Sequence, residues 1–196
     1  MKMLVRAALI VAALHAGGAA RAAESAENIL YMDLAFGRVV ITMRPDLAPG
    51  TCSHIRALVR RGFYDGVPFH RVIEGFMAQT GDPTGTGTGG SGHPIKPEFS
   101  AEKHVRGTVS MARTSDPNSA DSQFFIMYAP SPQLDGKYTI WGQVTSGMEL
   151  VDQIRKGDPA KNGMVANPDK IVRLQVALDA LAAQEKADTP GSLKPK

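Results

Sequence analysis

The chain has 196 residues, of which 43% are hydrophobic and 21% are charged, so it suits one globular domain and is not intrinsically disordered. Its single cysteine, Cys52, excludes an internal disulfide framework and a cysteine-rich zinc site. The formal net charge of +3 is small, and no apolar run reaches the roughly 18 residues that would span a bilayer.

Residues 1–22 contain the three parts of a secretory signal peptide in the usual order. Lys2 and Arg6 supply the positive start, residues 7–14 the short apolar core, and residues 20–22 the small side chains near a cleavage site. A buried N-terminal helix of the folded domain is the alternative. Three basic residues and no acid lie in this segment, so its removal leaves 19 basic and 19 acidic residues. The remaining chain therefore gives no charge argument for nucleic-acid binding.

The first elements beyond the leader are a hairpin and a helix. Residues 29–36 alternate between apolar and other side chains and residues 38–43 are rich in β-branched residues, which predicts a β-hairpin turning at Gly37. Residues 49–61 predict a helix with proline in its first turn and Gly62 just beyond its end. Its apolar stripe, which is expected to face inward, is Cys52, Ile55, Leu58 and Val59. Cys52 is therefore expected to be an inert thiol in the core.

The middle of the chain consists of short apolar runs separated by turn residues. Their spacing favours an antiparallel sheet or barrel over alternating β-α units. One long connection, residues 81–92, has six glycines in twelve residues. The apolar runs are residues 68–73, 75–80, 107–112, 123–128 and 139–144.

The C-terminal part predicts one more helix and one more strand. The helix covers residues 148–156, with Val151 and Ile154 facing inward. Alternation over residues 171–178 predicts a closing strand. We expect the folded domain to cover residues 23–183 and residues 184–196 to form a polar, disordered tail. The inward face of the closing strand is expected to be Val172, Leu174, Val176 and Leu178.

Common catalytic motifs are missing from the chain. The glycine-rich stretch lacks the pattern of a phosphate loop, and the four histidines beyond the leader lack metal-ligand spacing. Ser110, Ser122 and Cys52 are candidate nucleophiles, but none has the sequence context of a nucleophile elbow. Because candidate acid–base and nucleophilic groups are few, the sequence indicates either a binding module or an enzyme whose reaction breaks no covalent bond.

One segment points to the second alternative. Residues 69–82, Phe-His-Arg-Val-Ile-Glu-Gly-Phe-Met-Ala-Gln-Thr-Gly-Asp, resemble the signature of the cyclophilins, which are β-barrel peptidyl-prolyl cis-trans isomerases. Further cyclophilin-like motifs follow in the family's order, and the resemblance runs from about residue 28 to residue 178. These motifs are residues 62–66, 85–90, 107–112, 122–126 and 134–137.

The resemblance implies an eight-stranded antiparallel barrel capped by two α-helices, which needs no metal, nucleotide or other cofactor. Residues 111–117 resemble the bacterial branch, which together with the leader predicts a periplasmic protein. The expected partners are proline-containing unfolded or loop segments of other exported proteins. The chain is expected to be a monomer that binds no nucleic acid and, after signal removal, no membrane. The alternative is a peptide-binding chaperone or scaffold of the same fold without useful turnover.

The resemblance also implies roles for individual residues. Arg71 matches the catalytic residue, which donates toward the prolyl nitrogen or the neighbouring carbonyl as the amide twists. Gln79 matches a side chain that binds substrate backbone, and Arg113 matches a main-chain contact, so the Arg113 side chain is expected to matter less. The predicted substrate-binding residues are Phe76, Met77, Gln79, Ala112, Arg113, Gln123, Phe125, Leu134 and Tyr138, of which Phe76, Met77, Phe125 and Leu134 hold the proline ring.

The chain departs from the best-known animal cyclophilins at three places. Gln133 stands where they carry tryptophan, Tyr138 stands where they carry histidine, and the loop of residues 113–121 replaces their Asn-Ala-Gly type sequence. These changes bear on inhibitor binding and on the preference for residues that flank proline. His70 is expected to be a hydrogen-bonded structural residue, and Trp141 to be part of the core.

Overall fold

The computed structural model describes residues 23 and 25–188. The predicted signal peptide, residues 1–22, lies outside this part of the chain, as do residue 24 and residues 189–196. Within the described residues, no helix is both long and apolar enough to cross a membrane.

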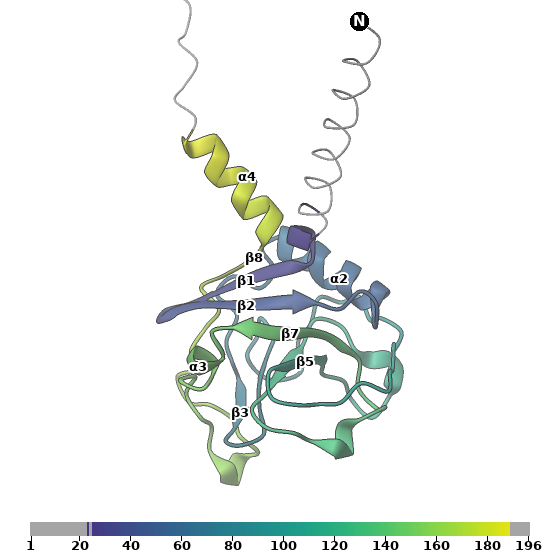
Figure 1. Ribbon diagram of the computed structural model, residues 1–196. Coiled ribbons are helices and arrows are strands. Elements are labelled where there is room, and N and C mark those ends of the chain that lie inside the picture. The colour runs from purple at the N-terminus through teal and green to yellow at the C-terminus, as the bar shows by residue number, and fades with distance from the viewer. Residues whose placement is uncertain (1–22, 24, 189–196) are drawn as a thin grey trace, which may run out of the picture.

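Eight antiparallel strands form one curled sheet (Figure 1). Their order across the sheet is β3-β4-β6-β5-β7-β2-β1-β8, so β3 and β8 are its two ends. The stretches that precede these ends pair with each other, because Phe69 N donates to Asp169 O and Ile171 N donates to Val67 O, both at 2.9 Å. The predicted eight-stranded barrel is confirmed. The strands are β1 Ile29–Leu34, β2 Gly37–Met43, β3 Arg71–Ile73, β4 Met77–Thr80, β5 Thr108–Met111, β6 Phe124–Met127, β7 Ile140–Ser146 and β8 Arg173–Val176.

The predicted N-terminal hairpin is present as β1 and β2. Leu34 pairs with Gly37, so the turn itself falls on residues 35–36 and Gly37 begins the second strand. Gly37 has a φ of +146°, and a Cβ added there would lie 2.7 Å from a methyl carbon of Leu150. Glycine is therefore needed at this point both for its backbone conformation and for the close approach of Leu150.

The helix α2, Pro49–Arg60, matches its prediction closely and packs its apolar stripe into the barrel. Its N-terminus is capped from a distance: the Glu98 carboxylate accepts hydrogen bonds from Gly50 N at 2.9 Å and Thr51 N at 2.8 Å. These bonds satisfy amides that the helix itself leaves free. The Cys52 thiol is fully buried, and burial raises its pKa to about 11, as expected for an inert core thiol.

The C-terminal predictions need correction. The helix α3, Met148–Val151, is shorter than predicted, although Val151 and Ile154 are buried as expected. Val172 is 57% exposed rather than inward-facing, because Ile171 N bonds Val67 while Val172 N bonds Asp33, which interrupts the strand alternation before β8.

A further helix, α4, follows β8 directly and covers Ala177–Asp188. It begins at residue 177 within the predicted strand and includes residues 184–188 of the predicted disordered tail. Its sequence is rich in Ala, Leu, Glu, Gln and Lys, which favour helix even without a buried face. The predicted pair of helices was therefore incomplete, and α4 projects away from the barrel (Figure 1).

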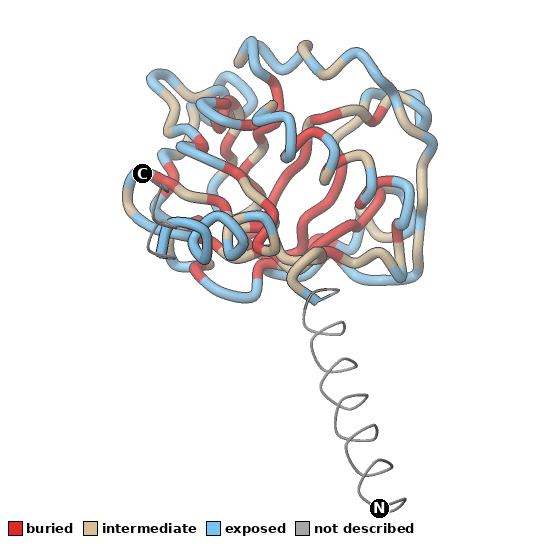
Figure 2. Tube along the Cα trace, turned by 90° about the horizontal axis from the view of Figure 1, so that it is seen from above, coloured by how far each residue is buried: buried red, intermediate tan, exposed pale blue. Residues whose placement is uncertain are grey.

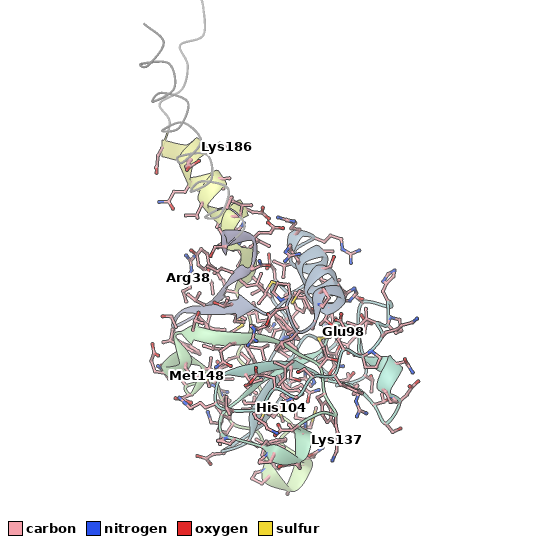
Figure 3. All side chains as sticks on the ribbon, turned by 45° about the vertical axis from the view of Figure 1, so that its right-hand side comes forward. Arg38, Glu98, His104, Lys137, Met148 and Lys186 are labelled. Atoms are coloured by element: carbon pink, nitrogen blue, oxygen red, sulfur yellow. The ribbon has the colours of Figure 1, made fainter. Side chains whose placement is uncertain are left out.

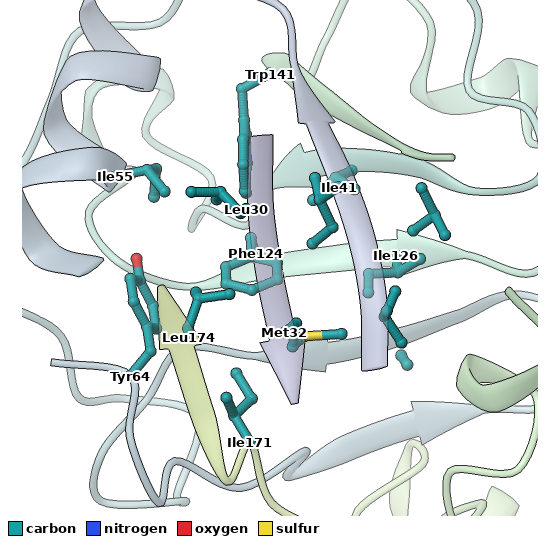
Figure 4. Packing of buried hydrophobic residues seen from close by; sticks show 14 of the residues in the cluster. Leu30, Met32, Ile41, Ile55, Tyr64, Phe124, Ile126, Trp141, Ile171 and Leu174 are labelled. Atoms are coloured by element: carbon teal, nitrogen blue, oxygen red, sulfur yellow. The ribbon is translucent and has the colours of Figure 1, made fainter. Parts of the chain in front are cut away.

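Buried side chains form two separate clusters. The larger cluster fills the barrel and the space under α2, and the buried segments run through the middle of the molecule (Figure 2). Trp141 lies in this cluster, fully buried and edge-on to Phe124 at 5.3 Å between ring centroids, which confirms its predicted place in the core (Figure 4). The smaller cluster consists of Met77, Phe125 and Met127, and partly exposed apolar residues surround it.

Candidate active site

The smaller apolar cluster borders a surface hollow of about 470 Å³. The structure brings nine of the ten predicted site residues to this hollow and places Gln123 beside an adjoining one. Three of the strands, β3, β4 and β6, and the loops around them supply the lining. The nine residues are Arg71, Phe76, Met77, Gln79, Ala112, Arg113, Phe125, Leu134 and Tyr138.

The register of the sheet places the central residues in one row. Arg71 on β3 pairs with Gln79 on β4, and Gln79 pairs with Phe125 on β6. Phe125 in turn pairs with Ser110 on β5. Because directly opposed residues on neighbouring strands point to the same face, the cation, the amide and the aromatic ring all face the hollow.

The Arg71 guanidinium is held by three hydrogen bonds to neutral oxygens. Its Nε donates to the Asn162 carbonyl and its Nη2 to Asn162 Oδ1, both at 3.0 Å. Its Nη1 donates to Gln79 Oε1 at 3.0 Å. Burial lowers the pKa of Arg71, but a guanidinium keeps its charge at any physiological pH. Two of its five N–H groups are left to face a ligand.

A chain of amides continues from Arg71 to the glycine-rich loop. Gln79 Nε2 donates to Gln123 Oε1 at 2.9 Å. Gln123 Nε2 donates to the carbonyls of Gly87 at 3.0 Å and Gly89 at 2.9 Å. Gln123 therefore supports Gln79 and the loop rather than lining the main hollow.

The glycine-rich loop folds around one buried carboxylate. Asp82 accepts hydrogen bonds from the main-chain N–H groups of Thr84, Gly87 and Gly89, at 2.7–3.1 Å, and from the hydroxyl of Thr84 at 2.7 Å. Backbone N–H groups of this kind bind phosphate in a phosphate loop. Here the chain's own carboxylate occupies them, which agrees with the prediction that residues 81–92 are not a phosphate site.

His104 supports the aromatic wall from behind. Its side chain is fully buried, its ring stacks on Phe125 at 6.2 Å, and it meets Tyr138 edge-on at 6.5 Å between centroids. The ring nitrogens lie 3.1 Å from Asp135 Oδ1 and 3.1 Å from Ser110 Oγ. Burial lowers the pKa of His104 against the opposing effect of Asp135, so the ring is neutral at neutral pH.

Figure 3 shows His104 on the same side of the barrel as Lys137 and away from α4. The spacing of the histidines in the sequence bears only on metal binding, and nothing in it marks His104 as a support for the aromatic wall. Within the described residues, no cluster of three or more His, Cys, Asp or Glu side chains could hold a metal ion.

His70 is a buried residue at the hollow. It is 2% exposed and lines the hollow, but neither ring nitrogen has a well-formed hydrogen bond to a protein group. Burial lowers its pKa despite the nearby charge of Asp82, so it too is neutral at neutral pH. His70 is therefore buried as expected of a structural residue, and its predicted hydrogen bonding stays a prediction.

Other lining residues were not predicted at all. Thr86 and Gly87 lie in the glycine-rich loop, within the motif of residues 85–90, to which no site role was assigned. Asn162 and Met164 come from a loop about 90 residues beyond Arg71 that no motif marks. Asn162 has a φ of +53°, in the left-handed region, and this conformation directs both of its oxygens to Arg71.

Comparison with known proteins identifies the same family as the sequence motifs do. A family model described as cyclophilin type peptidyl-prolyl cis-trans isomerase matches residues 29–176. A probable peptidyl-prolyl cis-trans isomerase of Brucella suis biovar 1 (strain 1330) is 50% identical over 191 residues, covering 89% of this chain and 97% of that protein. Peptidyl-prolyl cis-trans isomerase B of Bacillus subtilis (strain 168) is 44% identical over 126 residues, covering 63% of this chain and 87% of that protein.

Solved structures are similar across most of the chain. A Cryptosporidium parvum cyclophilin type peptidyl-prolyl cis-trans isomerase, crystallised in the presence of the dipeptide Ala-Pro, has a TM-score of 0.69 and 32% identity. The match covers 76% of this chain and 98% of that one. Cyclophilin AquaCyp293 from Hirschia baltica also has a TM-score of 0.69, with 29% identity, covering 77% of this chain and 74% of that one.

The Asp82 cluster leads to a prediction for acid stability. Burial acts to raise the pKa of Asp82, but hydrogen bonds from Thr84, Gly89 and Gly87 outweigh it and lower the pKa to about 2. Because this lies below the unfolded value of about 3.9, ionised Asp82 stabilises the fold above pH 4, and the contribution is lost as the pH falls toward 2. We expect Asp82→Asn to lower the free energy of unfolding by about 2 kcal/mol at pH 7.

Urea unfolding at pH 7 and pH 3 measures this difference, with the exposed Glu149→Gln as a control. The gap between Asp82→Asn and the unmodified protein should be narrower at pH 3. A gap of the same size at both pH values would contradict the assignment of an ionised carboxylate.

Proposed function

The chain belongs to the cyclophilin-type peptidyl-prolyl cis-trans isomerases, and we propose that it accelerates X–Pro rotation by binding the twisted amide between Arg71 and the apolar wall of the hollow. The observation that carries this mechanism is the fixed, uncompensated guanidinium of Arg71 beside that wall. No nucleophile or proton carrier is required by such a reaction.

The energetics of the reaction explain why one donor is effective. Rotation about a peptide bond faces a barrier of about 18–20 kcal/mol, because amide resonance is lost when the bond twists. The prolyl nitrogen then regains a lone pair that the planar amide lacks. Arg71, already held in place by Asn162 and Gln79, can donate an N–H to this lone pair or to the neighbouring carbonyl. The bond is stronger in the twisted state than in either planar state, which lowers the barrier.

The apolar wall has a separate task. Phe76, Met77, Phe125, Leu134 and Tyr138 offer the proline ring a surface that excludes water. A ring held against this surface stays fixed while the preceding residue rotates. Exclusion of water also strengthens the hydrogen bond from Arg71. The Cryptosporidium relative crystallised in the presence of Ala-Pro supports proline-containing peptide as the ligand.

The cellular role we propose is the folding of other exported proteins in the periplasm. The support is the signal-like composition of residues 1–22, which lie outside the described part of the chain. X–Pro isomerisation takes about 10–100 s without catalysis, so it limits the folding of proteins that have already crossed the membrane.

Mass spectrometry of the protein from its native host tests this location. We expect the abundant form to begin near Ala23 and to fractionate outside the cytoplasm. An intact chain that begins at Met1 and stays in the cytoplasm would contradict the export proposal, while leaving the isomerase mechanism in place.

The central prediction concerns Arg71. Arg71→Ala should lower kcat/KM on a short X–Pro peptide by about 10²–10³, because one preorganised donor is lost. Arg71→Lys should restore little of this activity, since a point charge does not reproduce the fixed planar fork. A protease-coupled assay measures the rates, and circular dichroism checks that the fold is intact.

The exposed Arg173→Ala, which removes an arginine far from the hollow, is the matched control for Arg71→Ala. Near-normal turnover of a folded Arg71→Ala variant would remove Arg71 from the mechanism. Peptide binding without any acceleration by the unmodified protein would instead favour a chaperone or scaffold.

The proposed mechanism also predicts little pH dependence. The arginine, amide and apolar groups do not titrate between about pH 6 and 9. Burial lowers the pKa of both His70 and His104, so these rings stay neutral in that window. We expect a nearly flat profile of kcat/KM from pH 6 to 9, measured by exchange NMR on a peptide without titratable groups. A bell-shaped profile would show that a titrating side chain carries catalysis.

A further inference from the structure

The side chain of Arg113 is held at the edge of the hollow. Its Nη2 donates to the Lys137 carbonyl at 2.9 Å and its Nη1 to the Thr114 carbonyl at 2.8 Å. The guanidinium lies over the Tyr138 ring, 4.5 Å from its centroid, and 5.9 Å from the ring centroid of Phe99. The family resemblance implies mainly a main-chain role for Arg113, whereas its side chain forms part of the rim.

Arg113 differs from most other arginines of the fold because none of its partners is an acid. Arg38, Arg60 and Arg106 each bind a carboxylate at 2.5–2.7 Å. The carbonyls around Arg113 fix its position without neutralising its charge. Arg71 is held by neutral oxygens in the same way. The residues that line the main hollow therefore include two uncompensated guanidinium groups and no carboxylate.

The acids near this region have other partners. Asp121 lines the adjoining hollow, but its carboxylate accepts bonds from the Ser91 hydroxyl and from Gly92 N at 2.8 Å. It also lies 3.7 Å from His54 Nε2. Asp82 and Asp135 are engaged by the glycine-rich loop and by the His104 main chain and ring. None of these carboxylates bonds Arg113.

Arg113 and its neighbour also lie on the path between the two hollows. Ala112 and Arg113 line both of them, so a bound chain that passes from one hollow to the other crosses this pair. The strand β5 ends at Met111, and within the described structure the main-chain N–H of Arg113 donates no hydrogen bond. An extended peptide can therefore lie along residues 112–113.

We propose that Arg113 makes this isomerase favour proline segments that carry Asp or Glu one or two residues before the proline. The proposal rests on the proposed function and names a substrate class for the same site. Tyr138 walls the proline hollow and lies directly under the guanidinium, and each extended residue spans about 3.3–3.6 Å. A carboxylate one or two residues from the proline therefore comes within reach of the charge.

Matched peptides test the proposal. Acetyl-Ala-Glu-Pro-Phe and acetyl-Glu-Ala-Pro-Phe p-nitroanilides are compared with their Gln counterparts. The acetyl cap removes the positive charge of a free N-terminus, so Glu is the only charged group of the peptide. At low salt we expect a Glu/Gln ratio of kcat/KM of about 3–5 for at least one of the two positions, the range for an exposed charge pair. The ratio should fall toward one in 0.5 M salt, because ions screen exposed charges.

Two variants with the same change of charge assign the effect. Arg113→Gln should bring the Glu/Gln ratio near one, whereas Arg173→Gln, on the exposed side of β8 near α4, should keep it. A ratio of two peptides on one variant is not affected by a general loss of activity. It therefore separates charge recognition from a merely structural role of Arg113 in holding Tyr138.

Every outcome decides the proposal. Acceleration of Glu and Gln peptides at equal rates overturns the role of Arg113 and leaves the isomerase function standing. A ratio that survives Arg113→Gln, or that occurs only for Glu placed after the proline, overturns it as well. No acceleration of any peptide overturns the proposed function and this inference with it.

Discussion

The site depends on a positive charge that is fixed in place without being neutralised. Arg71 is held by two oxygens of Asn162 and one of Gln79, and all three are neutral. A carboxylate in the same place would hold the guanidinium as firmly, but it would compete with the substrate for the charge. Neutral acceptors leave the charge of Arg71 uncompensated at the hollow and two of its N–H groups without a protein partner. The pairing of β3, β4 and β6 places Gln79 beside Arg71, and the left-handed backbone at Asn162 directs its oxygens to the same guanidinium.

Four carboxylates of this molecule have a different task, which is to bind main-chain N–H groups of other segments. Asp82 gathers the amides of the glycine-rich loop, Glu98 caps α2, and Asp135 binds the main-chain N–H of His104. Asp65 likewise accepts from Leu174 N at 3.0 Å. Long segments around the hollow have no strand or helix of their own, so these contacts replace regular backbone pairing. The rim can then be built from loops and still be held in one geometry.

Neutral aromatic and imidazole rings complete the site. His104 stacks behind Phe125, and His70 lies in the lining with its charge disfavoured by burial. The reaction that the family catalyses moves no proton and breaks no covalent bond, so a site of fixed charge and apolar surface is sufficient. Because no proton is moved and no covalent bond is broken, the sequence needs no evident acid–base pair or nucleophile.

The sequence by itself determined the elements whose pattern is local. The β1–β2 hairpin, α2 and the apolar runs that became β3 to β7 follow from alternation, helical stripes and turn residues, and the motif of residues 69–82 identified the family. Local pattern failed near the C-terminus. There Val172 turned outward because its neighbour Ile171 pairs with Val67, a residue more than 100 positions away.

Only the tertiary structure decided how the site is supported. Asn162 reaches Arg71 across 91 positions, and the Arg113 side chain meets the Lys137 carbonyl across 24. His104 became a support for Phe125 because the sheet brings their strands and loops together. Such contacts depend on strand register and loop path, which arise from the whole barrel, so no periodicity or spacing within a short segment encodes them.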